Sequence, residues 1–220
     1  YKGQRLNERT LRHAYYTNQI LEAYKYVGGY SAGDKLVVDI GGAYGGLLRY
    51  LKYYNSRSTC ILIELPEVLY LADYYLTRSF PGSKILRFSK DLISNGSLRK
   101  EVLLGYDFVL LTPSLIQYFE NASVDLMINT TSLGEMTVKM QNYYASMVNS
   151  KTKTLFYSVN RFSSATDTFK PWSSKQSVND TLFDTSPGIN QFNLDENWVP
   201  ISIKNTKTYH LEQALLRRLS

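Results

Sequence analysis

With 220 residues, of which 44% are hydrophobic and 20% are charged, the chain has the length and composition of one globular domain. Its net charge of +6 comes from scattered Lys and Arg residues, and no apolar run reaches about 18 residues, so we expect neither a nucleic-acid partner nor a membrane span. Cys60 is the only cysteine, which excludes an internal disulfide and favours a reducing compartment, the cytoplasm.

Apolar runs typical of strands alternate with segments of helical spacing along the chain. In chain order we predict a helix over 6–26, a strand over 35–40, a helix over 47–54, a strand over 59–64, a helix over 66–79, a strand or an insertion over 84–88, a short helix over 98–104, strands over 108–111 and 123–129, a helix over 134–149 and a strand over 154–159. This alternation predicts a Rossmann-like, doubly wound α/β fold with a mostly parallel sheet and an additional N-terminal helix.

The last quarter of the chain changes in character. Residues 160–200 are rich in Ser, Thr, Asp and Asn, and we interpret them as a long loop that is either functional, as a lid over an acceptor site, or disordered. Residues 201–220 are expected to add terminal, antiparallel edge strands. We therefore predict a single domain over 1–220, with an N-terminal helix (1–30) and a cofactor-binding core (31–159). No signal peptide is recognisable, and the start at Tyr1 rather than Met is compatible with a missing upstream segment.

The most informative segment is a glycine-rich turn between a predicted strand and a predicted helix, LVVDIGGAYGG at 36–46. A turn with few side chains lets a ligand approach the backbone, and the following helix offers free N–H groups and the positive end of its dipole. In a doubly wound sheet this turn lies at the carboxyl edge of the strands, where ligands bind. We therefore expect a nucleotide-type cofactor at this turn.

Two acidic residues indicate which cofactor the turn holds. Asp39 lies two residues before Gly41, where a carboxylate repels the pyrophosphate of a dinucleotide but attracts the cationic methionyl end of S-adenosylmethionine. Gly41, Ala43 and Gly46 give only a degraded match to the dinucleotide pattern G-x-G-x-x-G. Glu64 ends the next strand and can accept hydrogen bonds from the ribose hydroxyls of either cofactor. The sequence therefore favours S-adenosylmethionine.

Four segments carry a resemblance to a known family: VVDIGGAYGG at 37–46, ILIELPEVL at 61–69, VDLMINTTSLGEM at 124–136 and FYSVNRF at 156–162. Together they resemble the sugar O-methyltransferases of bacterial polysaccharide gene clusters, which are class I S-adenosylmethionine-dependent methyltransferases. The resemblance covers most of 30–162 and implies methyl transfer to a sugar hydroxyl of a glycan or nucleotide-linked sugar. One departure is Ala43, where the family usually has glycine; if this position requires a positive φ, alanine costs about 1 kcal/mol.

The resemblance also implies where the cofactor lies. The methionyl end would border the glycine turn, the ribose would lie against Glu64, the adenine would follow the strand over 108–111, and the sulfonium would lie near Asn129. The residues expected to contact the cofactor are Asp39, Gly41, Gly42, Ala43, Tyr44, Gly45, Glu64, Leu65, Thr112, Pro113, Ser114, Leu115 and Asn129.

Methyl transfer to a hydroxyl benefits from a general base, and the sequence offers several candidates. Glu135 is the first, because it follows the strand over 123–129 near the expected methyl position; an acid favoured by the dipole of a helix N-terminus is the alternative interpretation. The only histidines are His13 and His210, and either can serve as the base or have a structural role.

The acceptor is expected to lie beyond the fifth core strand. Asn160 and Arg161 end that strand and can hold an acceptor hydroxyl or phosphate, while Trp172 in the predicted loop can either anchor the loop to the core or stack on a sugar ring. We expect no metal, because acidic residues are dispersed and no histidine pair has the spacing of metal ligands.

Two other functions stay open at this point. A nicotinamide-dependent oxidoreductase would bind NAD(P) more tightly than S-adenosylmethionine. A non-catalytic, methyltransferase-like partner protein is compatible with Ala43 and with the lack of an obvious base, and it would bind the cofactor without turnover.

Overall fold

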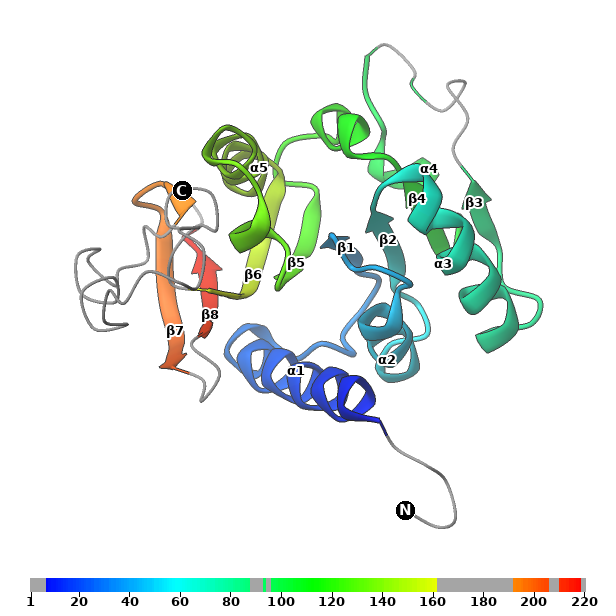
Figure 1. Cartoon of the computed structure of the whole chain (residues 1–220), viewed down its shortest axis with the longest axis horizontal. Coiled ribbons are helices and arrows are strands. Elements are labelled where there is room, and N and C mark those ends of the chain that lie inside the picture. The colour runs from blue at the N-terminus through cyan, green and yellow to red at the C-terminus, as the bar shows by residue number, and fades with distance from the viewer. Residues whose placement is uncertain (1–6, 88–92, 94–95, 162–191, 206–209, 219–220) are drawn as a thin grey trace, which may run out of the picture.

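The computed structural model describes residues 7–87, 93, 96–161, 192–205 and 210–218 (Figure 1). Its centre is an eight-stranded sheet in the order β3-β4-β2-β1-β5-β6-β8-β7. The strands are β1 (Leu36–Ile40), β2 (Thr59–Ile63), β3 (Ile85–Arg87), β4 (Phe108–Leu111), β5 (Val124–Thr130), β6 (Thr152–Arg161), β7 (Trp198–Asn205) and β8 (His210–Arg217). The α-helices are α1 (Glu8–Tyr24), α2 (Gly46–Tyr54), α3 (Pro66–Ser79), α4 (Lys100–Leu103) and α5 (Val138–Lys151).

The sheet confirms the predicted Rossmann-like, mostly parallel architecture. The strands from β3 to β6 pair in parallel, β8 runs antiparallel to β6, and β7 runs antiparallel to β8. The antiparallel strand β8 therefore pairs with β7 on its outer side, and β7 forms this edge of the sheet. Because β1 lies between β2 and β5, the strand order reverses at β1, and the glycine turn after it lies at the point where such sheets bind ligands.

The two faces of the sheet bury separate hydrophobic clusters. One cluster includes Leu103 of α4 and Val148 of α5, whereas the other includes Ile20 of α1, Leu48 of α2 and Leu76 of α3. In Figure 1, α1 and α2 accordingly lie on the opposite side of the central strands from α5. Successive side chains of a strand point to opposite faces, so every second residue of β1 faces α1.

Most of the helices and strands predicted from the sequence form, and three of them differ in their bounds or position. The helix predicted over 134–149 is divided into a 3-10 helix (Leu133–Glu135) and α5, because the Thr137 side chain caps α5 by accepting a hydrogen bond from the Met140 N–H at 3.4 Å. The segment predicted over 84–88 supplies β3, which lies outside β4, so β4 is the third core strand. The loop predicted over 160–200 ends before Trp198, because β7 begins at that residue. Residues 162–191 of this predicted loop lie outside the described part of the chain.

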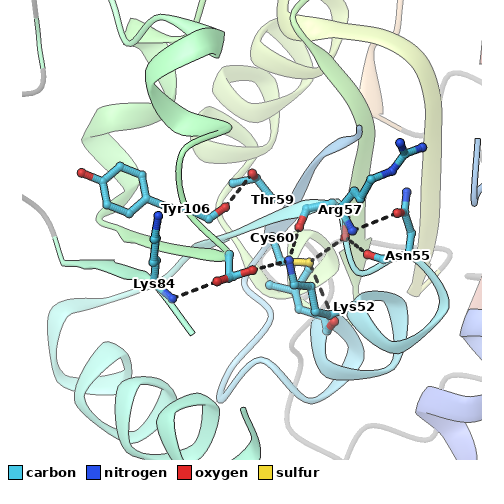
Figure 2. A network of polar contacts seen from close by, with 10 residues as sticks. Lys52, Asn55, Arg57, Thr59, Cys60, Lys84 and Tyr106 are labelled. Atoms are coloured by element: carbon cyan, nitrogen blue, oxygen red, sulfur yellow. Dashed lines mark hydrogen bonds and ion pairs between the residues drawn. The ribbon is translucent and has the colours of Figure 1, made fainter. Parts of the chain in front are cut away.

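A polar network ties α2 to the amino ends of β2 and β4 (Figure 2). The Lys52 ammonium, whose side chain is 7% exposed, forms an ion pair of 2.8 Å with Asp107 and donates a hydrogen bond of 2.6 Å to the Ser58 carbonyl. Asp107 also accepts a hydrogen bond of 2.8 Å from the Lys84 backbone N–H. Burial alone raises the pKa of Asp107, but these hydrogen bonds and the Lys52 charge outweigh burial and lower it. The network thus holds three segments together at the edge far from the glycine turn.

Removing the buried amine should lower stability. Because Asp107 is 35% exposed and can be partly rehydrated, we expect Lys52→Ala to lower the free energy of unfolding by about 2 kcal/mol, between the values for exposed and fully buried pairs. The matched control is Lys25→Ala, which breaks an exposed pair with Glu22 and should cost about 0.5 kcal/mol. Urea denaturation measures both, and equal losses in the two variants would contradict a structural role for the network.

Candidate functional site

The turn after β1 depends on glycine at specific positions. Gly41 has a φ of +69° and Gly45 a φ of +81°, in the left-handed region that side chains disfavour. Gly42 has a different reason: a Cβ atom there would collide with the Asp39 carboxylate and with Leu62. The turn is fixed to the sheet by the Gly41 N–H, which donates to the carbonyl of Ile63 at 2.8 Å. The backbone therefore passes directly over the Asp39 carboxyl group.

Asp39 is an unpartnered acid under this turn. Its side chain is completely buried, and neither carboxylate oxygen has a hydrogen-bond partner among the described residues. Burial, and secondarily the charge of Glu64, raises the pKa of Asp39 from 3.8 to about 8. A buried carboxyl group without a partner is costly, so the site is suited to a ligand that brings a positive charge or hydrogen-bond donors.

Glu64 follows β2 and its carboxylate spans two backbone segments. One oxygen accepts a hydrogen bond from the Ala43 N–H at 3.1 Å, and the other accepts one from the Leu65 N–H at 2.8 Å. The Glu64 N–H in turn donates to the Leu111 carbonyl at the end of β4 at 3.1 Å. The glycine turn, Glu64 and Thr112 therefore follow one another along the carboxyl edge of the sheet, as expected from the sequence.

The residues after β2 and β4 that are predicted to contact the cofactor differ in exposure. Leu65 is 52% exposed and Ser114 is exposed, so both can contact a ligand at the edge of the sheet. The hydroxyls of Thr112 and Ser114 lie 3.5 Å apart. Pro113 is half-buried and starts a 3-10 helix (Pro113–Tyr118), whereas Leu115 is 5% exposed and belongs to the hydrophobic core. The ligand-accessible part of this stretch is thus its first three residues.

The loop after β5 is held by two buried asparagines. The Asn129 amide donates to the Ile40 carbonyl at 2.7 Å and accepts from the Leu133 N–H at 3.1 Å, which joins this loop to the end of β1. The Asn160 amide donates to the Asn129 side chain at 2.9 Å and accepts from the Gly134 N–H at 3.0 Å. Both side chains are completely buried, so their amides position the loop.

A cavity of about 130 Å³ opens where the glycine turn, the end of β5 and α1 meet. Its lining residues are Arg9, Arg12, His13, Tyr16, Asp39, Gly41, Gly42, Ala43, Tyr44, Leu47, Thr130 and Thr131. Two of these have strained backbones, Ala43 with a φ of +51° and Thr131 with a φ of +62°. Positive φ is uncommon for alanine and exceptional for a β-branched residue, and such strain concentrates at functional sites.

The sequence pattern alone did not predict that α1 contributes to this cavity. Arg9, Arg12, His13 and Tyr16 follow the spacing of one helix face, a signal that becomes informative only once that face is known to cover the glycine turn. His13 packs beside the turn, where a Cβ on Gly46 would collide with its ring. Burial, followed by the charges of Arg9 and Arg12, lowers the pKa of His13 to about 4, so the imidazole is neutral at pH 7.

Tyrosine side chains fix α1 over the site. The Tyr15 hydroxyl donates to the buried Glu212 carboxylate of β8 at 2.9 Å, and the Tyr24 hydroxyl donates to the Asp125 carbonyl of β5 at 2.9 Å. Tyr16 packs between these anchors, with its ring centroid 6.1 Å from that of Tyr157 in β6. Because α1 is attached near its middle and at its C-terminal end, its orientation over the cavity is defined.

Two candidate residues of the acceptor site, Glu135 and His210, lie near the same edge of the sheet and are not among the residues that line the cavity. Glu135 is exposed in the 3-10 helix after β5. His210 begins β8 and pairs in register with Arg161, the last residue of β6. Trp172 lies outside the described residues. Within the described part of the chain, no group of three or more His, Cys, Asp and Glu side chains could hold a metal ion, and no helix there is long and apolar enough to cross a membrane.

Solved structures similar to this one include methyltransferases. The magnesium protoporphyrin IX methyltransferase of Synechocystis PCC 6803, solved with bound S-adenosylmethionine, matches with a TM-score of 0.55 and 12% identity over 98% of this chain and 86% of its own. A candidate RNA methyltransferase from Pyrococcus horikoshii matches with a TM-score of 0.54 and 13% identity over 92% of this chain and 81% of its own. No protein-family model and no curated protein matches the sequence. The chain therefore has the fold of class I S-adenosylmethionine-dependent methyltransferases.

The strain at Ala43 can be measured. Ala43→Gly should raise the free energy of unfolding by up to about 1 kcal/mol, because glycine adopts a positive φ without a steric penalty. Ala122→Gly is the matched control, since Ala122 has a φ of +50° in a turn away from the cavity. Urea denaturation should show similar gains in both variants. A loss of stability in Ala43→Gly beside a gain in Ala122→Gly would show that the Ala43 methyl group makes compensating contacts.

Proposed function

We propose that the protein is an S-adenosylmethionine-dependent O-methyltransferase that acts on a sugar hydroxyl of a glycan or nucleotide-linked sugar. The donor assignment rests on one observation, the completely buried and unpartnered carboxyl group of Asp39 beneath the glycine turn. The fold agrees with this assignment, because one of its solved examples contains S-adenosylmethionine. The free and buried thiol of Cys60 fits action in the cytoplasm.

The residues along the carboxyl edge fit the parts of the cofactor in order. The cavity beside Asp39 would receive the methionyl end, whose positive charges compensate the buried acid. Glu64 would accept hydrogen bonds from the ribose, and the exposed Leu65 and Ser114 would flank the adenine. A dinucleotide would instead bring its negative pyrophosphate toward Asp39, so the same geometry disfavours NAD(P).

Bound S-adenosylmethionine would supply an electrophilic methyl carbon, and the protein must align an acceptor oxygen with it. Such alignment contributes roughly 7–11 kcal/mol to lowering a reaction barrier. The loop after β5 would provide the alignment, because Asn129 and Asn160 fix its backbone and Thr130 and Thr131 face the cavity. Asn160 would thus support the acceptor site through this loop.

The sugar acceptor is supported by the sequence resemblance and by the groups near the ends of β5, β6 and β8. Glu135 and His210 are our candidates for the base that receives the hydroxyl proton, and Arg161 would hold a phosphate or hydroxyl of the acceptor. The register of β6 and β8 brings Arg161 and His210 side by side at this edge. Trp172 stays a candidate for stacking on the sugar ring.

Asp39→Asn should weaken cofactor binding and remove its pH dependence. With its pKa raised to about 8, Asp39 is protonated in the free protein at pH 7. A cationic ligand favours the ionised carboxylate, so binding releases a proton, and affinity should rise by up to about tenfold from pH 6 to pH 7. In Asp39→Asn this rise disappears and affinity at pH 7 is roughly tenfold lower. Isothermal titration calorimetry in buffers of different ionisation enthalpy measures the affinity and the released proton.

The unliganded variant serves as the folding control. The unfolded chain loses this proton near pH 4 and the folded protein near pH 8, so the wild type loses stability relative to Asp39→Asn as pH rises through this window. The variant should therefore unfold at the same or a higher temperature at pH 7. Equal affinity of wild type and variant for S-adenosylmethionine, or tighter binding of NAD(P), would overturn the donor assignment.

The acceptor and its base can be tested by turnover. Incubation with a panel of nucleotide-linked sugars and oligosaccharides should yield a methylated sugar, detected by mass spectrometry. If Glu135 is the base, Glu135→Gln should lower kcat by about 10²–10⁴-fold and remove the acidic limb of the pH profile, with unchanged cofactor affinity. His210→Asn is the parallel test for His210. Methylation of a non-sugar hydroxyl alone would retain the donor assignment and reject the sugar acceptor.

A further inference from the structure

The cavity at the glycine turn has an acidic residue on one wall and two cationic residues on the other. Asp39 lies on the sheet side, and Arg9 and Arg12 lie on the α1 side. The arginines are three residues apart, which places them on the same face of the helix. The Arg12 guanidinium contacts Glu8 at 2.9 Å, and the Arg9 guanidinium lies 5.7 Å from the centroid of the Tyr44 ring in the turn itself.

The arginine side of the cavity is electrostatically positive. His13 directly follows Arg12 in sequence and lines the same cavity, and burial together with the charges of Arg9 and Arg12 keeps its pKa low and its ring neutral. Glu8 compensates only part of this charge, because its side chain is 87% exposed and it contacts Arg12 alone among the ion pairs of the described residues. An anionic group inside the cavity would compensate the remaining positive charge of the two arginines.

A small ligand group with both charges fits this arrangement. The cavity volume of about 130 Å³ suits an amino-acid end rather than a whole nucleoside. An α-amino acid end carries an ammonium and a carboxylate on one carbon, so it can address Asp39 and the arginines at the same time. Arginine is suited to the carboxylate, because its planar guanidinium donates two parallel hydrogen bonds.

We infer that Arg9 and Arg12 bind the carboxylate of the cofactor's amino-acid end, opposite Asp39, so that the N-terminal helix is part of the cofactor site. This inference rests on the proposed function. The tyrosine anchors of α1 then have a role in binding, because Tyr15 and Tyr24 hold the arginines at a fixed position above the turn.

The test removes the carboxylate from the ligand and the guanidinium groups from the protein separately. The two ligands are S-adenosylmethionine and its decarboxylated form, which keeps the sulfonium, the ammonium and the nucleoside. The variant is Arg9→Gln with Arg12→Gln, and both positions are exposed on the helix, so folding should persist. Arg78→Gln, on the exposed surface of α3, is the control. Calorimetric titration gives each affinity, and thermal unfolding verifies folding.

In the double variant, affinity for S-adenosylmethionine should fall roughly 10–100-fold, while affinity for the decarboxylated ligand should change less than about threefold. Arg78→Gln should bind both ligands as the wild type does. Equal weakening for the two ligands, or no weakening for either, would overturn the role of the arginines and leave the donor assignment intact. Failure of the wild type to bind S-adenosylmethionine would overturn the proposed function and this inference with it.

Discussion

The site is organised around one unsatisfied group, the carboxyl of Asp39 buried beneath a turn of bare backbone. Gly42 must lack a side chain because the carboxyl occupies the space below it, and burial, with the nearby charge of Glu64, raises the pKa of this acid to about 8. The fold bears the cost of burying this acid at the point where its strand order reverses. A ligand that brings positive charge recovers part of the cost as binding energy.

The fold could be predicted largely from the sequence, because its signals are local. The apolar runs of β1, β2 and β4 and the glycine turn have the same bounds in sequence and structure to within two residues. Element type follows from the period of the hydrophobic residues, which needs no knowledge of distant contacts. The division before α5 was missed because Thr137 acts as a cap only after the preceding 3-10 helix has turned the chain.

The candidate site could be predicted only in part. Asp39 and Glu64 are recognisable because each occupies a fixed place relative to its own strand. The arginines of α1 are not, because their role depends on which face of the helix packs on the sheet, and that is decided by Tyr15 and Tyr24 contacting residues about 100 or more positions away. Asn160 was expected at the acceptor for its place at a strand end, yet its amide is engaged within the protein.

The Lys52 network has a consequence for how this protein could change over time. It occupies the amino ends of the strands, whereas every group assigned to the ligand lies at their carboxyl ends. The groups that stabilise the domain and the groups that would bind the ligands therefore lie at opposite edges of one sheet. Substitutions that strengthen the Lys52 end would create a reserve of stability, and loops at the other end could then vary, and acquire new acceptors, without unfolding the domain.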